Sequence, residues 1–97
     1  MSVFKNKSYD LLVKAIVAIE NEAECEAFLE DLMTVKELDS IAQRVDVAKL
    51  LSEQVVYNKI VDATGASTAT ISRVNRAYNY GTGGYKMILE KIVGEEK

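Results

Sequence analysis

The sequence contains no histidine and no proline, and it has a single cysteine among its 97 residues. Without histidine, His-dependent catalytic triads are excluded, and with one cysteine so are the usual zinc sites. Cys25 cannot form an intrachain disulfide, which favours a reducing cytoplasm. We expect its side chain to be buried as a small apolar residue. Because proline breaks helices, its absence permits a chain that is helical almost throughout.

Long apolar runs are also missing. No stretch approaches the roughly 20 residues that a membrane-spanning helix needs. Residues 1–10 lack the apolar centre and the small-residue cleavage site of a secretion signal. The glycine-rich residues 81–84 lack the lysine of a P-loop and follow no strand, so they indicate a turn. We therefore expect a cytoplasmic protein that is not an enzyme and binds neither metal nor membrane.

The composition predicts a single folded domain spanning residues 1–97. Hydrophobic residues make up 48% of the chain, which is ample for a core and suggests that some apolar surface is buried against a second copy. The net charge of −3 is unevenly distributed. Residues 1–56 carry six basic and eleven acidic side chains, whereas residues 57–86 carry four basic side chains and one acidic. A basic island in an acidic chain is typical of a surface that contacts phosphates.

Apolar residues at helical spacing predict an all-α fold of six helices without strands. Ser8 is expected to cap the first helix, and Thr34 with Glu37 forms a capping box at the start of the longest one. That helix should turn Leu38, Ile41, Val45 and Ala48, with Leu50 and Leu51, toward the core. The six predicted helices span residues 8–20, 23–33, 35–51, 55–64, 67–78 and 85–93.

The segment from Tyr57 to Ala77 has the pattern of a helix-turn-helix hinged on Gly65. A glycine at this position supplies the positive φ that the bend requires. Apolar side chains fall where the two helices must touch, and small alanines allow a close approach. These are Ile60, Val61, Ile71 and Val74, with Ala63, Ala66 and Ala69.

The second helix of this pair offers hydroxyl and guanidinium groups that can bond base edges and phosphates. We expect Thr68, Ala69 and Thr70 at the floor of the DNA groove, through thymine methyls or bridging waters. Phosphate candidates outside this helix are Tyr57, Lys59 and Lys86. The predicted contacts within the helix also include Ser67, Ser72, Arg73 and Arg76.

Other interpretations of the same pattern stay open. Glycine-hinged helix pairs are common in all-α proteins, and a helix start rich in serine and threonine is often only an N-cap. The chain could be a helical adaptor whose helix-turn-helix docks protein. It could also be a small-ligand sensor that does not read DNA sequence.

The order of these parts resembles the Trp repressor family, and in particular its repressor-related YerC/YecD-type branch. Three phrases carry the resemblance: LMT at 32–34, QRV at 43–45 and GASTATISR at 65–73. It implies an intertwined homodimer in which residues 1–54 form a dimerisation scaffold. Residues 55–78 would be the helix-turn-helix, and residues 79–97 a loop and the last helix. Two-fold symmetry would then place the paired recognition helices about 34 Å apart on a pseudo-palindromic operator of double-stranded DNA.

In that family a bound tryptophan sits between two arginines, and the resemblance carries these positions onto Arg44 and Arg73, with Thr34 near the ligand. The chain departs from the family at Val74, which replaces a glycine, and at Ala77, which replaces a serine. Val74 would fill space that the indole needs, or it is a core residue joining the two helices. Arg44 could instead pair with Asp46 or with a carboxylate of the partner, and Arg73 could hold a phosphate. We expect a transcriptional repressor with a different effector or none.

Overall fold

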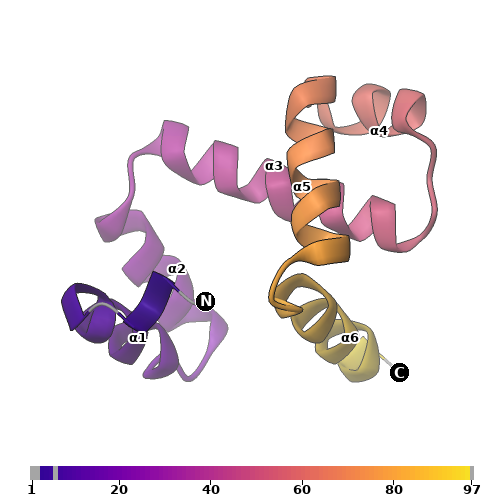
Figure 1. Ribbon diagram of the computed structural model, residues 1–97. Helices are drawn as coiled ribbons and strands as arrows, with labels where there is room; N and C mark the ends of the chain where they lie inside the picture. Colours follow the sequence, from indigo (N-terminus) through magenta and orange to yellow (C-terminus); the bar gives the residue numbers. More distant parts are fainter. Residues whose placement is uncertain (1–2, 6, 97) are drawn as a thin grey trace. The chain divides into compact units, whose positions relative to one another are not determined.

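The computed structural model describes residues 3–5 and 7–96, and the chain divides into two compact units, Met1–Leu38 and Asp39–Lys97. Across the described residues there are six α-helices, two 3-10 segments and no strand (Figure 1), so the predicted all-α class is confirmed. None of the helices in this part of the chain is long and apolar enough to cross a membrane.

The first unit contains the 3-10 segments Val3–Lys5 and Lys7–Tyr9, then α1 (Asp10–Val17) and α2 (Glu22–Leu32). Tyr9 occupies the N-cap of α1, so the prediction that Ser8 caps this helix was wrong: the preceding 3-10 turn shifts the helix start by two residues. In α2 the N-cap is Asn21, whose side-chain oxygen accepts from the Glu24 backbone N–H at 2.9 Å. Neither helix contains a buried residue.

Helix α3 (Val35–Ser52) begins at the predicted capping box. The Thr34 backbone N–H donates to Glu37 Oε1 at 2.9 Å, and the Glu37 backbone N–H donates to Thr34 Oγ1 at 3.1 Å. Hydrogen bonding from the Thr34 backbone, and next from its side chain, lowers the pKa of the Glu37 carboxyl below its ordinary value of 4.5. The carboxylate therefore caps the helix in its charged form.

The second unit packs α4 (Tyr57–Thr64), α5 (Thr68–Tyr80) and α6 (Gly84–Glu96) around the later part of α3 (Figure 1). Ile60, Ile71 and Val74 were predicted to join the two helices of the helix-turn-helix, and all three are buried. The complete buried core in the described residues is Val47, Ala48, Ile60, Ala66, Ile71, Val74 and Leu89.

The buried face of α3 differs from the predicted one. Val47 is fully buried, whereas Ile41 and Val45, both expected inside, are each 41% exposed. Helix α3 carries apolar residues on more than one face, and only the face bearing Val47 and Ala48 meets the core of this unit. Of the three small alanines expected between α4 and α5, Ala66 is buried, but Ala63 and Ala69 are exposed because they point away from the contact.

Candidate nucleic-acid interface

The turn between α4 and α5 is built around Gly65, which adopts φ 72° and ψ 5° in the left-handed region. Its backbone N–H donates to the Val61 carbonyl oxygen at 2.8 Å and closes α4. The Thr64 hydroxyl donates to the Ile60 carbonyl oxygen at 2.7 Å and accepts from the Ala66 backbone N–H at 3.1 Å. Glycine is the residue that takes this backbone conformation without strain, as the sequence predicted.

Ser67 is the N-cap of α5. Its Oγ accepts from the Thr70 backbone N–H at 3.1 Å and also donates to Thr70 Oγ1 at 3.1 Å. The capping role considered from the sequence is therefore present. Thr70 is half-buried and bonded to Ser67, so it is less available for the groove floor than the exposed Thr68 and Ala69.

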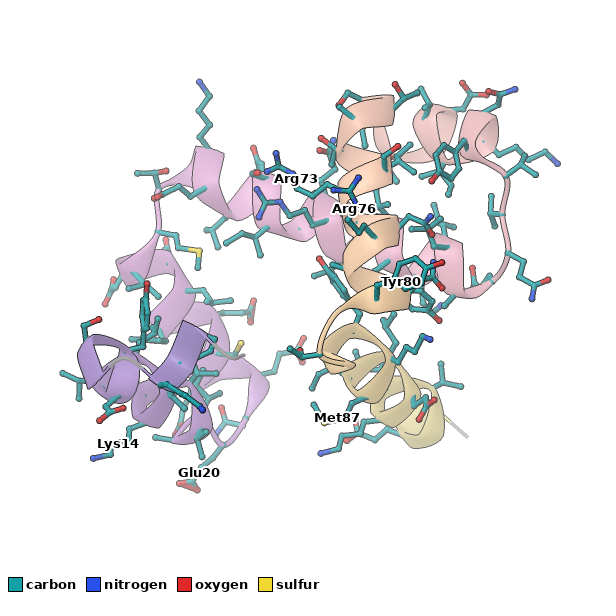
Figure 2. All side chains as sticks on the ribbon, viewed as in Figure 1. Lys14, Glu20, Arg73, Arg76, Tyr80 and Met87 are labelled. Atoms are coloured by element: carbon teal, nitrogen blue, oxygen red, sulfur yellow. The ribbon has the colours of Figure 1, made fainter. Side chains whose placement is uncertain are left out.

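One face of α5 is buried by Ile71 and Val74, and the other is exposed. Because residues three and four apart lie side by side on a helix, Thr68, Ser72 and Arg76 form one exposed row, and Ala69 and Arg73 form the next. Neither arginine forms an ion pair within the described residues, and Figure 2 shows both guanidinium groups beside α5. The helix thus presents hydroxyls and two uncompensated cations on one side.

Arg44 on α3 and Arg73 on α5 line a small shared pocket of about 160 Å³, together with Ala69 and Thr70. In the described part of the chain Arg44 forms no ion pair, so the pairing with Asp46 that the sequence left open is absent. Thr34, the third effector candidate, belongs to the other unit, where its hydroxyl accepts the capping bond from Glu37.

The two departures from the family pattern lie outside this pocket. Val74 is only 2% exposed and belongs to the core cluster with Val47, Ile60 and Ile71. It is therefore a core residue that joins the two helices, the simpler of the two roles considered from the sequence. Ala77 lines a separate open groove of about 470 Å³.

The remaining phosphate candidates lie on α4 and α6. Tyr57 and Lys59 are in the first turn of α4 and are exposed. Lys86 is exposed on α6, with its Nζ 5.2 Å from the centre of the Tyr78 ring. Tyr78 lies ten residues beyond Thr68, about 15 Å along the helix axis. Lys86 therefore lies near the C-terminal end of α5. Thr68 and Ala69 are exposed at the opposite, N-terminal end.

Two features were not foreseen from the sequence. Gln43 Nε2 donates to the Thr64 carbonyl oxygen at 3.1 Å and joins α3 to the end of α4. Its only sequence signal is a polar residue in the QRV phrase. The second feature is the open groove between α5 and α6, whose mostly apolar walls include Val45, Tyr85 and Ile88. Its only sequence signal was the apolar residues at 87–89 and 92, after the glycine-rich loop.

Comparison with known proteins gives the family. The family model described as Trp repressor protein matches residues 7–93. The uncharacterized protein YerC of Bacillus subtilis (strain 168) is 46% identical over 88 residues, covering 91% of this chain and 85% of YerC.

Two solved structures are similar in both sequence and fold. A provisionally assigned Trp repressor from Staphylococcus aureus has a TM-score of 0.88 and 42% identity, covering 95% of this chain and 94% of its own. A TrpR-like protein from Eubacterium eligens ATCC 27750 has a TM-score of 0.86 and 44% identity, covering 91% of each chain. The capping box, the left-handed glycine turn and these matches together show that the chain belongs to the Trp repressor family, in its YerC-type branch.

Proposed function

We propose that this protein is a cytoplasmic, homodimeric transcriptional regulator, a repressor, that binds a specific DNA sequence through α4 and α5 and carries out no catalysis. The observation that carries the proposal is the exposed side of α5. Thr68, Ser72 and Arg76 share one row there while Ile71 and Val74 anchor the opposite side in the core. Membership of a regulator family supports the same conclusion.

In this proposal α5 is the recognition helix and enters the major groove at its N-terminal end. Thr68 and Ala69 carry short exposed side chains that fit against thymine methyls or bridging waters. The first backbone N–H groups of α5 and the helix dipole favour a phosphate at the same end. Among the described residues no carboxylate pairs with Arg73 or Arg76, so both remain available for bases or phosphates.

The proposed dimer rests on the exposed apolar residues of the first unit. Helices α1 and α2 bury no residue, and Leu11 and Val17 are 79% and 76% exposed. Exposed apolar surface of this kind marks a protein–protein contact, and a second copy of the chain would cover it. Such a dimer would place two recognition helices about 34 Å apart, matched to a pseudo-palindromic operator. Sedimentation equilibrium over a range of concentrations measures this association.

Replacement of Arg76 tests the DNA interface. The operator is first selected from random duplex fragments that the wild-type protein retains at moderate salt. Arg76→Ala and Arg76→Lys are then titrated with this duplex over a range of salt concentrations, with Lys91→Ala on α6 as a control that removes one exposed positive charge elsewhere. Arg76→Ala is expected to weaken binding by about 1–3 kcal/mol if Arg76 contacts a base, and Arg76→Lys should not restore it.

If Arg76 holds a phosphate, the alanine variant loses about one unit of salt slope and the lysine variant recovers it. Affinity and salt dependence equal to those of Lys91→Ala would remove Arg76 from the interface. A wild-type protein that retains no duplex at any salt concentration would reject DNA binding. The groove bearing Val45 and Ile88 would then favour the second candidate function, a helical adaptor that docks protein through apolar contact.

A further inference from the structure

We infer that the chain fixes the orientation of its recognition helix by its own contacts, with Gln43 as the positioning residue. The inference rests on the proposed function, because it concerns how the DNA-binding surface of α5 is presented. Two observations carry it: the Gln43 bond and the packing of α5 on α3.

The acceptor of the Gln43 bond is one of the last carbonyl groups of α4. Such carbonyls have no partner within their own helix. Gln43 Nε2 reaches the Thr64 carbonyl oxygen across 21 positions in sequence, and the bond is half-buried at 3.1 Å. It therefore ties the end of α4, immediately before the Gly65 turn, directly to α3.

The turn is held from its inner side as well. The Thr64 hydroxyl bonds backward to the Ile60 carbonyl and forward to the Ala66 N–H, while Ile60 and Ala66 are buried. The backbone between α4 and α5 thus makes a continuous set of bonds, and Gln43 is the member of that set that belongs to α3. Loss of this one donor would leave the Thr64 carbonyl half-buried with no donor among the described residues.

Helix α5 is attached to the same part of α3 by apolar contact. Ile71 and Val74 of α5 lie in one buried cluster with Val47 and Ala48 of α3. Because Gln43 precedes Val47 by four residues, the polar bond and the apolar contact are one helical turn apart on α3. Both halves of the helix-turn-helix are therefore fixed to a single helix segment.

Amide hydrogen exchange on the full-length protein without DNA tests the positioning role. Gln43→Met removes the donor while keeping an unbranched side chain, and Gln54→Met is the control at the exposed glutamine after α3. We expect the amides of Gly65, Ala66 and Ile71 to exchange roughly 2- to 10-fold faster in Gln43→Met, as the loss of one hydrogen bond implies. The Met87 amide of α6 should not change.

Two further variants separate a local effect from general unfolding. Gln43→Arg restores an N–H donor of similar reach and should return the turn amides to wild-type rates. Should Gln43→Met fail to fold, Gln43→Asn, which keeps the amide but shortens its reach, carries the same expectation. Turn amides that exchange equally in the Gln43 and Gln54 variants would overturn the positioning role.

Titration of the selected operator tests the consequence for DNA binding. We expect the affinity of Gln43→Met to be lower than that of Gln54→Met. Equal affinities of these two variants would overturn the positioning role in DNA binding while leaving DNA binding itself intact. Failure of the wild-type protein to bind any duplex would instead reject the proposed function, and the exchange rates would still decide the role of Gln43.

Discussion

Replacement of Val74 by alanine is a direct test of how α5 is anchored. Val74 is 2% exposed in the cluster that joins α3, α4 and α5. The change removes two buried carbon atoms, which costs about 1.6 kcal/mol at about 0.8 kcal/mol each. Incomplete closure of the resulting cavity adds up to about 1 kcal/mol. The better helix propensity of alanine returns about half a kcal/mol, so the net loss should be about 2 kcal/mol.

The assay is urea unfolding followed by circular dichroism at one fixed protein concentration, because association would otherwise shift the apparent stability. Val56→Ala is the matched control, since Val56 is 60% exposed at the N-cap of α4 and should change stability by no more than about 0.5 kcal/mol. In a thermal scan the Val74 variant should unfold about 8–16 °C below the wild type. Equal losses in the two variants would refute the assignment of Val74 to the core.

Two other substitutions test the local signals of the fold. Gly65→Ala should lower the free energy of unfolding by about 1 kcal/mol, because an alanine at φ 72° is strained even where its methyl group meets nothing. Gly94→Ala, in helical α6 with open space around it, should instead be neutral or stabilising in the same urea assay. The lowered pKa of Glu37 means that its contribution is present above pH 4.5 and is lost as the pH falls through the folded pKa. The difference in melting temperature between the wild type and Glu37→Gln should therefore shrink in acid, and a constant difference would contradict the capping role of the carboxylate.

Local signals made much of the fold predictable. The capping box of Thr34 and Glu37 and the left-handed glycine depend on residues within a few positions of one another, and both are present as predicted. The same locality explains the error at the start of α1. Ser8 has the chemistry of a cap, but the 3-10 turn before Asp10 decides which residue stands at the N-cap.

The partners of α3 could not be predicted from its own residues. Its apolar residues serve more than one face, and periodicity does not say which face belongs to this unit's core. Val47 is buried by contacts from α4, α5 and α6, whereas Val45, two residues earlier, lines an open groove. Gln43 was missed for the same reason, because its partner Thr64 is 21 positions away and only the packing of α4 brings the two together.

The two faces of α3 bear on how the proposed DNA-binding surface could be regulated. The face with Gln43 and Val47 holds the helix-turn-helix, and the 41% exposed Ile41 and Val45 contribute nothing to that core. A second copy that covered the exposed face would stabilise α3 itself, because any partner that binds only the folded state adds to its stability. Because α3 holds both α4 and α5, dimerisation would then also stabilise the orientation of the proposed recognition helix. The partner would not need to contact that helix. In such a protein the concentration of the chain would influence how much of it can bind DNA.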